Sequence, residues 1–207
     1  MSRESHGERR RREIVEAATD LSTVEGLAAL SLSRIAGEVG LTKPGVAAHF
    51  ESKQALQLSV VAAAAAAYAE PLAQAEAAAE PGLARLRALV EAWLDHLEAI
   101  PYRGGCFFAA AGQAFGGRPG PVRDRIAQHT RRFLHGLEEQ ARLAERLGEL
   151  RSGVDADVLA FSLHGLAGEA NLRRELLDEP EAFALARRAL DQLLRDAAAR
   201  PDEETSP

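Results

Sequence analysis

The only two lysines of the chain, Lys43 and Lys53, lie in one short stretch together with Thr42 and His49. The residues between them are mostly small, so a helix formed here presents a compact, partly polar and cationic outer surface. Such a surface suits the major groove of DNA, because bulky side chains hold a backbone away from the base edges and lysines bind phosphates. Spacing alone is equally compatible with an ordinary helical hairpin. The predicted DNA contacts are Ser31, Ser33, Thr42, Lys43, Pro44, Gly45, Ala47, Ala48, His49 and Lys53.

A second group of residues, between Trp93 and Phe133, has the composition of a ligand cavity. Aromatic side chains are interspersed here with a few polar ones, which suits an apolar cavity whose polar groups orient a small molecule. The alternative is an ordinary core with satisfied or exposed histidines. The residues predicted to bind a ligand are Trp93, His96, Leu97, Tyr102, Cys106, Phe107, Phe108, Gln113, His129 and Phe133.

Residues for catalysis or metal binding follow no recognisable pattern. None of the six histidines pairs at i and i+4 with a nearby second ligand, and Cys106 is the single cysteine. The sequence also lacks a glycine-rich phosphate loop and a serine elbow. It therefore predicts no metal, no cofactor and no enzyme activity.

The compartment is inferred from the cysteine usage and from the start of the chain. A single cysteine cannot form an internal disulfide, and no charged and then apolar leader opens the sequence. The most apolar run, residues 60–69, is too short and too weakly hydrophobic to span a bilayer. A cytoplasmic protein without membrane contact is expected.

Two short helices joined by a tight turn are predicted to position the first group of residues. Ser31 can cap the first helix, and Gly40 can adopt the left-handed conformation that ends it. Thr42 can cap the second helix, on which Val46 and Phe50 lie four residues apart and face inward. This arrangement is a helix-turn-helix.

The remainder of the chain is also predicted to be helical. Aromatic residues make up 5% of the chain, and no segment alternates like a strand, so an all-α fold is expected. A polar arm, residues 1–7, precedes a first helix whose apolar stripe extends to Val24 and ends at Gly26. A long helix starts at Ser52 and is expected to kink or break at Pro71. Further helices are predicted over residues 83–100, 106–115, 122–148, 155–177 and 181–199.

The stretch from Leu32 to Lys53 resembles the DNA-binding signature of the tetracycline-repressor-like (TetR) family of bacterial transcription regulators. The matching positions are Ile35, Ala36, Gly40, Thr42, Lys43, Val46, His49, Phe50, Ser52 and Lys53. One position departs from the pattern, because the family usually carries a tyrosine where this chain has Ala47. The resemblance implies a cavity for a small effector and a homodimer whose interface is a four-helix bundle built from the last two helices of each subunit.

The distribution of charge is uneven along the chain. Residues 1–53 carry eight Lys and Arg and eight Asp and Glu, so the net charge of −6 falls on the remainder. The acidic part is expected to point away from DNA. The basic run Arg9–Arg12 is interpreted either as phosphate-binding or as a solvated helix start.

These patterns predict a ligand-responsive regulator with three parts. Residues 1–53 form a helix-turn-helix DNA-binding domain with an N-terminal arm, residues 54–199 a helical ligand-binding and dimerisation domain, and residues 200–207 a disordered tail. A homodimer would bind a pseudo-palindromic double-stranded DNA operator and, as a repressor, release it on binding a small apolar effector. The alternative is a helix-turn-helix regulator without such a ligand, controlled by oxidation of Cys106 or by a protein partner.

Overall fold

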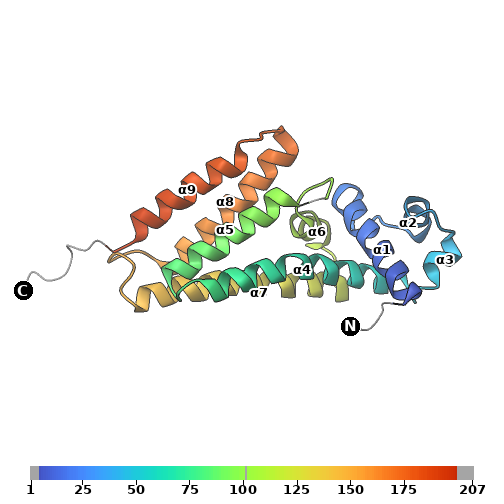
Figure 1. The fold of residues 1–207 in the computed structure, drawn as a ribbon, viewed down its shortest axis with the longest axis horizontal. Helices are drawn as coiled ribbons and strands as arrows, with labels where there is room; N and C mark the ends of the chain where they lie inside the picture. Colours follow the sequence, from blue (N-terminus) through green and yellow to red (C-terminus); the bar gives the residue numbers. More distant parts are fainter. Residues whose placement is uncertain (1–4, 101, 200–207) are drawn as a thin grey trace, which may run out of the picture. The chain divides into compact units, whose positions relative to one another are not determined.

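The computed structural model describes residues 5–100 and 102–199, which are predominantly helical (Figure 1). Within these residues one isolated bridge, between Leu150 and Ala198, is the only strand-like pairing. The predicted all-α class is confirmed, whereas the predicted disordered tail lies outside the described residues. The elements are α1 (His6–Leu21), η1 (Ser22–Gly26), α2 (Leu32–Glu38), α3 (Lys43–Ala47), α4 (Lys53–Ala78), α5 (Leu83–Ala99), α6 (Phe107–Phe115), α7 (Pro121–Arg146), α8 (Ala156–Leu177) and α9 (Ala182–Ala197).

The first helix begins within the predicted polar arm, at His6. Ser5 and Glu8 form a capping box: the Glu8 N–H donates to Ser5 Oγ (3.2 Å), and the Ser5 N–H donates to the Glu8 carboxylate (2.8 Å). Two backbone donors that a helix start leaves unpaired are satisfied in this way. The arm prediction is therefore wrong for His6 and Gly7, and residues 1–4 lie outside the described part.

The end of the first helical segment also differs from the prediction. After Leu21 the chain continues as the π-helical turn η1, which ends at Gly26 with φ of +84°. A π turn contains more residues than an α turn, so it rotates the following side chains out of the α-helical register. Val24, predicted to face inward, is consequently 58% exposed.

The long helix α4 does not end at Pro71 but continues to Ala78. Proline removes a single N–H donor, and the alanine-rich sequence around it has the highest helix propensity, so one lost hydrogen bond does not terminate the helix. By length and composition α4 is the one described helix that could cross a membrane. Its residues Leu56, Val60 and Val61 are nevertheless buried in a protein core, as expected for a core helix of a globular domain.

The chain forms two compact units. Unit 1 contains the chain up to Ala67 together with Ile100–Thr130, and unit 2 contains Tyr68–Ala99 and the chain from Arg131 onward. Neither unit is one continuous stretch, because α4 and α7 contribute to both. A domain boundary at residue 53 stays a prediction.

The core of unit 1 joins the helix-turn-helix to a distant segment of the sequence. Ile14 of α1, Ile35 of α2 and Val46 of α3 are fully buried, and Phe107 and Phe115 of α6 belong to the same apolar cluster. Burial of large apolar side chains is the main stabilising term in such a core. The α6 helix therefore packs on η1 and shares one apolar core with the helix-turn-helix.

Unit 2 contains α5, α8 and α9, and α8 and α9 form an antiparallel hairpin (Figure 1). Asp155 caps α8 by accepting from the N–H groups of Asp157 (2.9 Å) and Val158 (3.1 Å). Arg187 on α9 binds carboxylates on α5, including Asp95 at 2.6 Å and Glu98 at 2.7 Å. Apolar burial and this cross-helix ion-pair network hold α9 on α5.

Candidate functional site

The two helices of the predicted helix-turn-helix are capped as expected. Ser31 Oγ accepts from the Arg34 N–H (3.2 Å), and Thr42 Oγ1 accepts from the Gly45 N–H (3.2 Å). Gly40, with φ of +65°, forms the turn between them. The second helix is shorter than predicted, because α3 ends at Ala47 and Phe50 follows it in a turn. Val46 and Phe50 are both buried, so the opposite side of α3 faces outward.

The outward surface of this helix pair carries the predicted DNA contacts. Gly45 and His49 are half-buried, and the remaining eight predicted residues are exposed. Along α3 this surface is small and cationic, since Lys43 is its only charged side chain. The arrangement lets the α3 backbone come close to base edges, with an ammonium group at one end for a phosphate.

Arg11 on α1 supports the turn that follows α3. Its guanidinium donates to the His49 carbonyl and to Ser59 Oγ (3.0 Å), and it lies 4.3 Å from the centroid of the Phe50 ring. Arginine suits this position because its planar group can stack on an aromatic ring while it donates at its edge. Arg11 belongs to the basic run Arg9–Arg12, but the sequence carries no signal of this supporting role.

Other cations near the helix pair also have partners within the protein. Arg10 and Arg12 lie near carboxylates of their own helix, at 2.7 Å from Glu13 and 3.6 Å from Glu16. The Lys53 Nζ donates to the Ala28 carbonyl (2.7 Å) in the turn that precedes α2. Lys53 is exposed and therefore still accessible to a phosphate.

The residues predicted to bind a ligand are divided between the two units. Unit 1 contains Tyr102, Cys106, Phe107, Phe108, Gln113 and His129, whereas unit 2 contains Trp93, His96, Leu97 and Phe133. In unit 1, the Phe108 ring lies 5.2 Å from Phe107 and 6.1 Å from His129, Phe107 is part of the core, and Gln113 is exposed.

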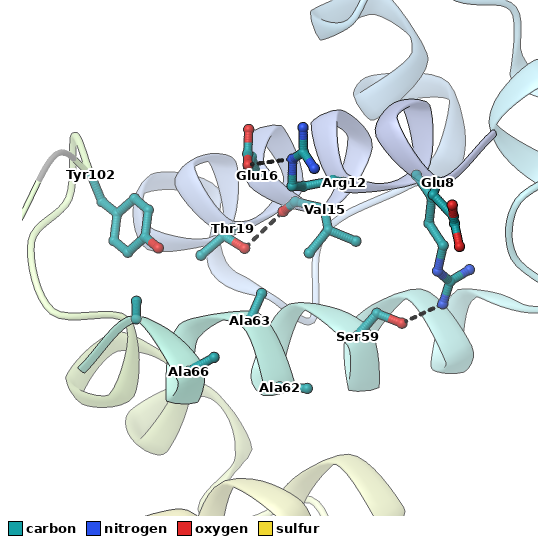
Figure 2. A pocket seen from close by; sticks show the side chains of 12 residues that line it. Glu8, Arg12, Val15, Glu16, Thr19, Ser59, Ala62, Ala63, Ala66 and Tyr102 are labelled. Carbon is teal, nitrogen blue, oxygen red and sulfur yellow. Dashed lines mark hydrogen bonds and ion pairs between the residues drawn. The ribbon is translucent and has the colours of Figure 1, made fainter. Parts of the chain in front are cut away.

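Tyr102 lies at one end of a groove between α1 and α4, shown in Figure 2. The groove has a volume of about 600 Å³, and alanines of α4, such as Ala63 and Ala66, form its floor. Burial, followed by the nearby Glu16 and Asp20 carboxylates, raises the pKa of the Tyr102 phenol. Tyr102 is thus neutral at physiological pH, and it belongs to unit 1.

An aromatic cluster in unit 2 combines three predicted residues with two that were not predicted. The Trp93 ring lies 4.5 Å from Phe133 and stacks on His164 at 4.9 Å, and Tyr68 lies 6.1 Å from His96 and 6.4 Å from Phe133. Leu97, the fourth predicted residue of this unit, is buried. Tyr68 and His164 come from α4 and α8. They lie far from Trp93 in the sequence, so no sequence pattern indicates that these rings pack together.

A cavity of about 360 Å³ adjoins this cluster. Tyr68, Leu72, Leu89, Phe133 and Gln140 contribute to its wall. The Gln140 Oε1 accepts from the Gly82 N–H (3.0 Å), which orients the amide, and burial lowers the pKa of both His96 and His164. The cluster itself therefore offers aromatic surface and neutral imidazoles. Fixed charge reaches the cavity wall through Glu76, Arg132 and Glu139.

Cys106 precedes α6 as its N-cap residue and is half-buried. Burial raises the pKa of its thiol, an effect that outweighs the hydrogen bonds from the Ala109 and Phe108 backbones. A protonated thiol is a poor nucleophile. Across residues 5–100 and 102–199, no three histidine, cysteine or acidic side chains are grouped as a metal site.

The α8–α9 hairpin exposes a large apolar surface. Phe161 is 80% exposed, and Val158, Leu172 and Leu176 on the same helix are also exposed. Between them lie Gly165 and Gly168, where an added Cβ would meet no heavy atom within 4 Å. Exposed apolar area of this kind marks an interaction surface.

Models of known protein families match both parts of this chain. The model described as bacterial regulatory proteins, tetR family, matches residues 14–60. The model described as the tetracyclin repressor-like C-terminal domain matches residues 82–190, which is more than half of the chain. A search of curated proteins found no match.

Solved structures share the fold over nearly the whole chain. A TetR transcriptional regulator from Chloroflexus aurantiacus is 24% identical, covers 93% of this chain and 97% of its own, and has a TM-score of 0.81. A putative transcriptional regulator from Saccharomonospora viridis, in complex with choline, is 20% identical with coverages of 93% and 99% and a TM-score of 0.77. AibR, in complex with isovaleryl coenzyme A and operator DNA, is 21% identical with coverages of 91% and 99% and a TM-score of 0.74. At these identities the similarity concerns the fold.

Proposed function

This chain belongs to the tetR family of bacterial regulatory proteins, and from that premise we propose that it is a repressor that binds operator DNA through α3 and releases it when a small apolar effector binds in unit 2. Proteins of this family are DNA-binding transcription regulators and not enzymes. The observation that carries the proposal is the outward surface of α3, on which exposed Lys43 lies beside small residues.

The α8–α9 hairpin is the proposed dimer interface. Its exposed apolar side chains need a partner, and the open space at Gly165 and Gly168 permits close helix approach. A second copy of the chain satisfies both requirements with a self-complementary, two-fold surface. Two α3 helices related by this symmetry would bind a pseudo-palindromic operator.

The proposed effector site is the aromatic cluster of unit 2 and its adjoining cavity. Tyr68, Trp93 and Phe133 provide apolar surface, and Gln140 provides an amide for a single polar group of the ligand. AibR was solved with isovaleryl coenzyme A and the Saccharomonospora viridis regulator with choline, which supports a small-molecule effector for this chain. The protein would act in the cytoplasm, without a membrane or a metal.

Control by Cys106 is the less favoured alternative, because burial raises the pKa of the thiol and leaves little thiolate to be oxidised. Replacing Cys106 with serine is expected to leave operator binding and its response to effectors unchanged. Loss of the response in Cys106→Ser would favour the redox alternative.

The test of the proposed function begins with selection of DNA. Genomic fragments of the source organism retained by the protein would be sequenced, and a pseudo-palindromic site shared among them is expected. The same site would then serve in a screen of small apolar compounds for release of the protein. Absence of any preferred DNA sequence would refute the proposal.

A further inference from the structure

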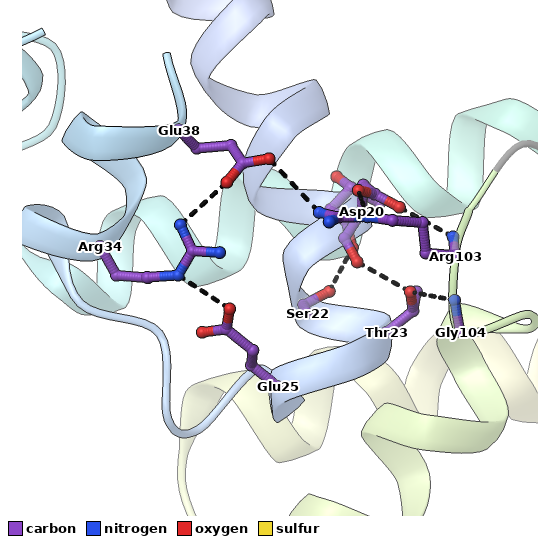
Figure 3. A network of polar contacts seen from close by, with 9 residues as sticks. Asp20, Ser22, Thr23, Glu25, Arg34, Glu38, Arg103 and Gly104 are labelled. Carbon is purple, nitrogen blue, oxygen red and sulfur yellow. Dashed lines mark hydrogen bonds and ion pairs between the residues drawn. The ribbon is translucent and has the colours of Figure 1, made fainter. Parts of the chain in front are cut away.

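A polar network in unit 1 ties the loop before α6 to the helix-turn-helix, as shown in Figure 3. The Arg103 backbone N–H donates to Asp20 Oδ1 (2.8 Å), and its Nε donates to Asp20 Oδ2 (2.6 Å). A terminal nitrogen of Arg103 also lies 3.4 Å from Glu38 Oε1. One loop residue therefore joins the end of α1 to the last residue of α2.

The network continues along α2 to the preceding turn. Arg34 donates to the second Glu38 oxygen (2.8 Å) and to Glu25 Oε1 in η1 (2.8 Å). Carboxylates and guanidinium groups thus alternate along a chain of five side chains, in the order Asp20, Arg103, Glu38, Arg34 and Glu25. The Arg34–Glu38 bond lies within α2, whereas the bonds of Arg103 to Asp20 and Glu38 and of Arg34 to Glu25 restrict the position of α2 relative to α1 and η1. The α2 helix leads directly into α3.

The loop also makes close backbone contact with η1. The Gly104 N–H donates to Thr23 Oγ1 (3.0 Å), and a Cβ at residue 104 would lie only 2.3 Å from the Thr23 carbonyl oxygen. Any side chain at residue 104 would therefore push the loop away from η1. This close approach places Arg103 between its two acidic partners.

From this geometry we propose that Arg103 is a positioning residue for operator binding: it holds α2, through Asp20 and Glu38, at the separation from α1 that orients α3 on DNA. The inference rests on the proposed role of α3. It adds a residue outside the helix-turn-helix sequence, contributed by the loop that follows α5. The α5 helix carries Trp93 and His96 of the aromatic cluster and ends at Ala99, so this loop is also where the chain returns to unit 1.

The stability of the fold depends little on Arg103. Its side chain is 54% exposed, and exposed ion pairs contribute little to folding. The orientation of α2 is a more sensitive quantity, because base contacts require the reading helix to be placed accurately in the groove. Removal of Arg103 is therefore expected to affect DNA recognition more than unfolding.

The experiment compares full-length wild type with Arg103→Ala on the selected operator duplex and on an unrelated duplex, at several salt concentrations. Operator affinity is expected to fall roughly fivefold or more. The salt slope, which is the slope of log affinity against log salt concentration, should stay close to wild type. The affinity for the unrelated duplex and the midpoint of urea unfolding should also stay close to wild type. Arg125→Ala, which removes an exposed arginine of α7 in the same unit, is the matched control and is expected to bind as wild type.

A double-mutant cycle tests the route through Asp20. Arg103→Ala combined with Asp20→Asn is expected to bind operator no more weakly than Arg103→Ala alone, because both changes break the same link. Gly104→Ala, which displaces the loop without changing charge, is expected to weaken operator binding in the same way. Faster amide exchange in α2 of both loop variants would accompany these losses.

The outcomes separate this inference from the proposed function. If wild type recognises no operator, the proposed function fails. If wild type does and Arg103→Ala binds it equally well, the positioning role is wrong. A salt slope reduced by about one in Arg103→Ala would show direct phosphate contact instead and would also overturn the inference. If Arg103→Ala unfolds at markedly lower urea, Asp20→Asn replaces it, and unchanged operator affinity there counts against the proposal.

Discussion

Lys53 shows how one side chain can combine a structural contact with an available charge. Its ammonium group donates to the Ala28 carbonyl (2.7 Å), yet the side chain remains exposed. An ammonium group has three donors, so one bond to a carbonyl leaves two for a phosphate. Lys53 is therefore expected to contribute both to the turn before α2 and to DNA affinity.

Replacing Lys53 with alanine is expected to weaken binding to all DNA sequences and to reduce the salt slope by about one. The free energy of unfolding should fall by at most about 1 kcal/mol, the usual size of one lost hydrogen bond. Fluorescence anisotropy at several salt concentrations and urea unfolding measure the two effects. Arg125→Ala, which removes an exposed arginine of α7, is the control; an unchanged slope in Lys53→Ala would exclude its phosphate contact.

His96 and His164 make the stability of unit 2 depend on pH. Burial lowers the pKa of both rings below the unfolded value of about 6.5. As the pH falls below 6.5, the unfolded chain takes up protons before the folded protein does, so stability decreases until the pH passes the lowered folded pKa. Both rings retain partial solvent access, so solvent screening keeps each effect small.

Urea unfolding of wild type and His164→Phe at about pH 7.5 and 5.5 tests this effect. Phenylalanine can keep the stacking with Trp93 but cannot be protonated, so the variant should lose less stability on acidification than wild type. His135→Gln, at an exposed position of α7, should behave as wild type. Equal losses in His164→Phe and wild type would show that His164 is not responsible.

At the scale of elements, α8 and α9 differ from the other helices in what they expose. Helices in a finished core direct their large apolar side chains inward, as Phe183 and Leu190 of α9 do. On α8, however, Phe161 and Leu176 are exposed to 80% and 69%. The proposed interface with a second copy would cover this surface.

Replacing Gly165 with leucine should weaken self-association without damaging the subunit. The space around this position is open within the protein, so the larger side chain would collide only with a partner helix. Light scattering and sedimentation at micromolar concentration measure the association. Gly112→Leu, at an exposed and open position of α6, is the matched control; a monomeric wild type, or a fully dimeric Gly165→Leu, would contradict the proposed interface.

At the scale of the whole molecule, the proposed function requires coupling between effector and operator. An effector lowers operator affinity only to the extent that it binds the operator-free conformation more tightly than the operator-bound one. Operator DNA must then weaken effector binding by the same factor. Trp93 is the single tryptophan of the chain and lies in the aromatic cluster. Its fluorescence is therefore expected to report effector binding.

Phe133→Ala should abolish the fluorescence response to compounds that release the operator, because the Phe133 ring lies 4.5 Å from Trp93 and lines the cavity. Phe107→Ala is the comparison: Phe107 is buried in unit 1, so its loss should lower stability but leave the fluorescence response. Fluorescence titration of both folded variants measures this. The opposite result would locate the effector site in unit 1.

The local features of the DNA-binding part could be predicted from short stretches of the sequence. The caps at Ser31 and Thr42 and the left-handed turn at Gly40 depend on hydrogen bonds and backbone preferences that act within a few residues. The same is true of the inward spacing of Val46 and Phe50. Such short-range terms can be evaluated without knowing where the rest of the chain lies.

Only the tertiary structure decided which distant side chains meet. Arg11 binding the His49 carbonyl, Arg103 binding Asp20, and Tyr68 and His164 joining Trp93 all link residues far apart in sequence. From the sequence alone, an arginine could pair with any of many carboxylates and carbonyls. An aromatic residue could likewise pack against many different apolar side chains. Their partners are chosen when the apolar faces pack, because the burial of those faces sets the helix positions and polar pairing follows from them.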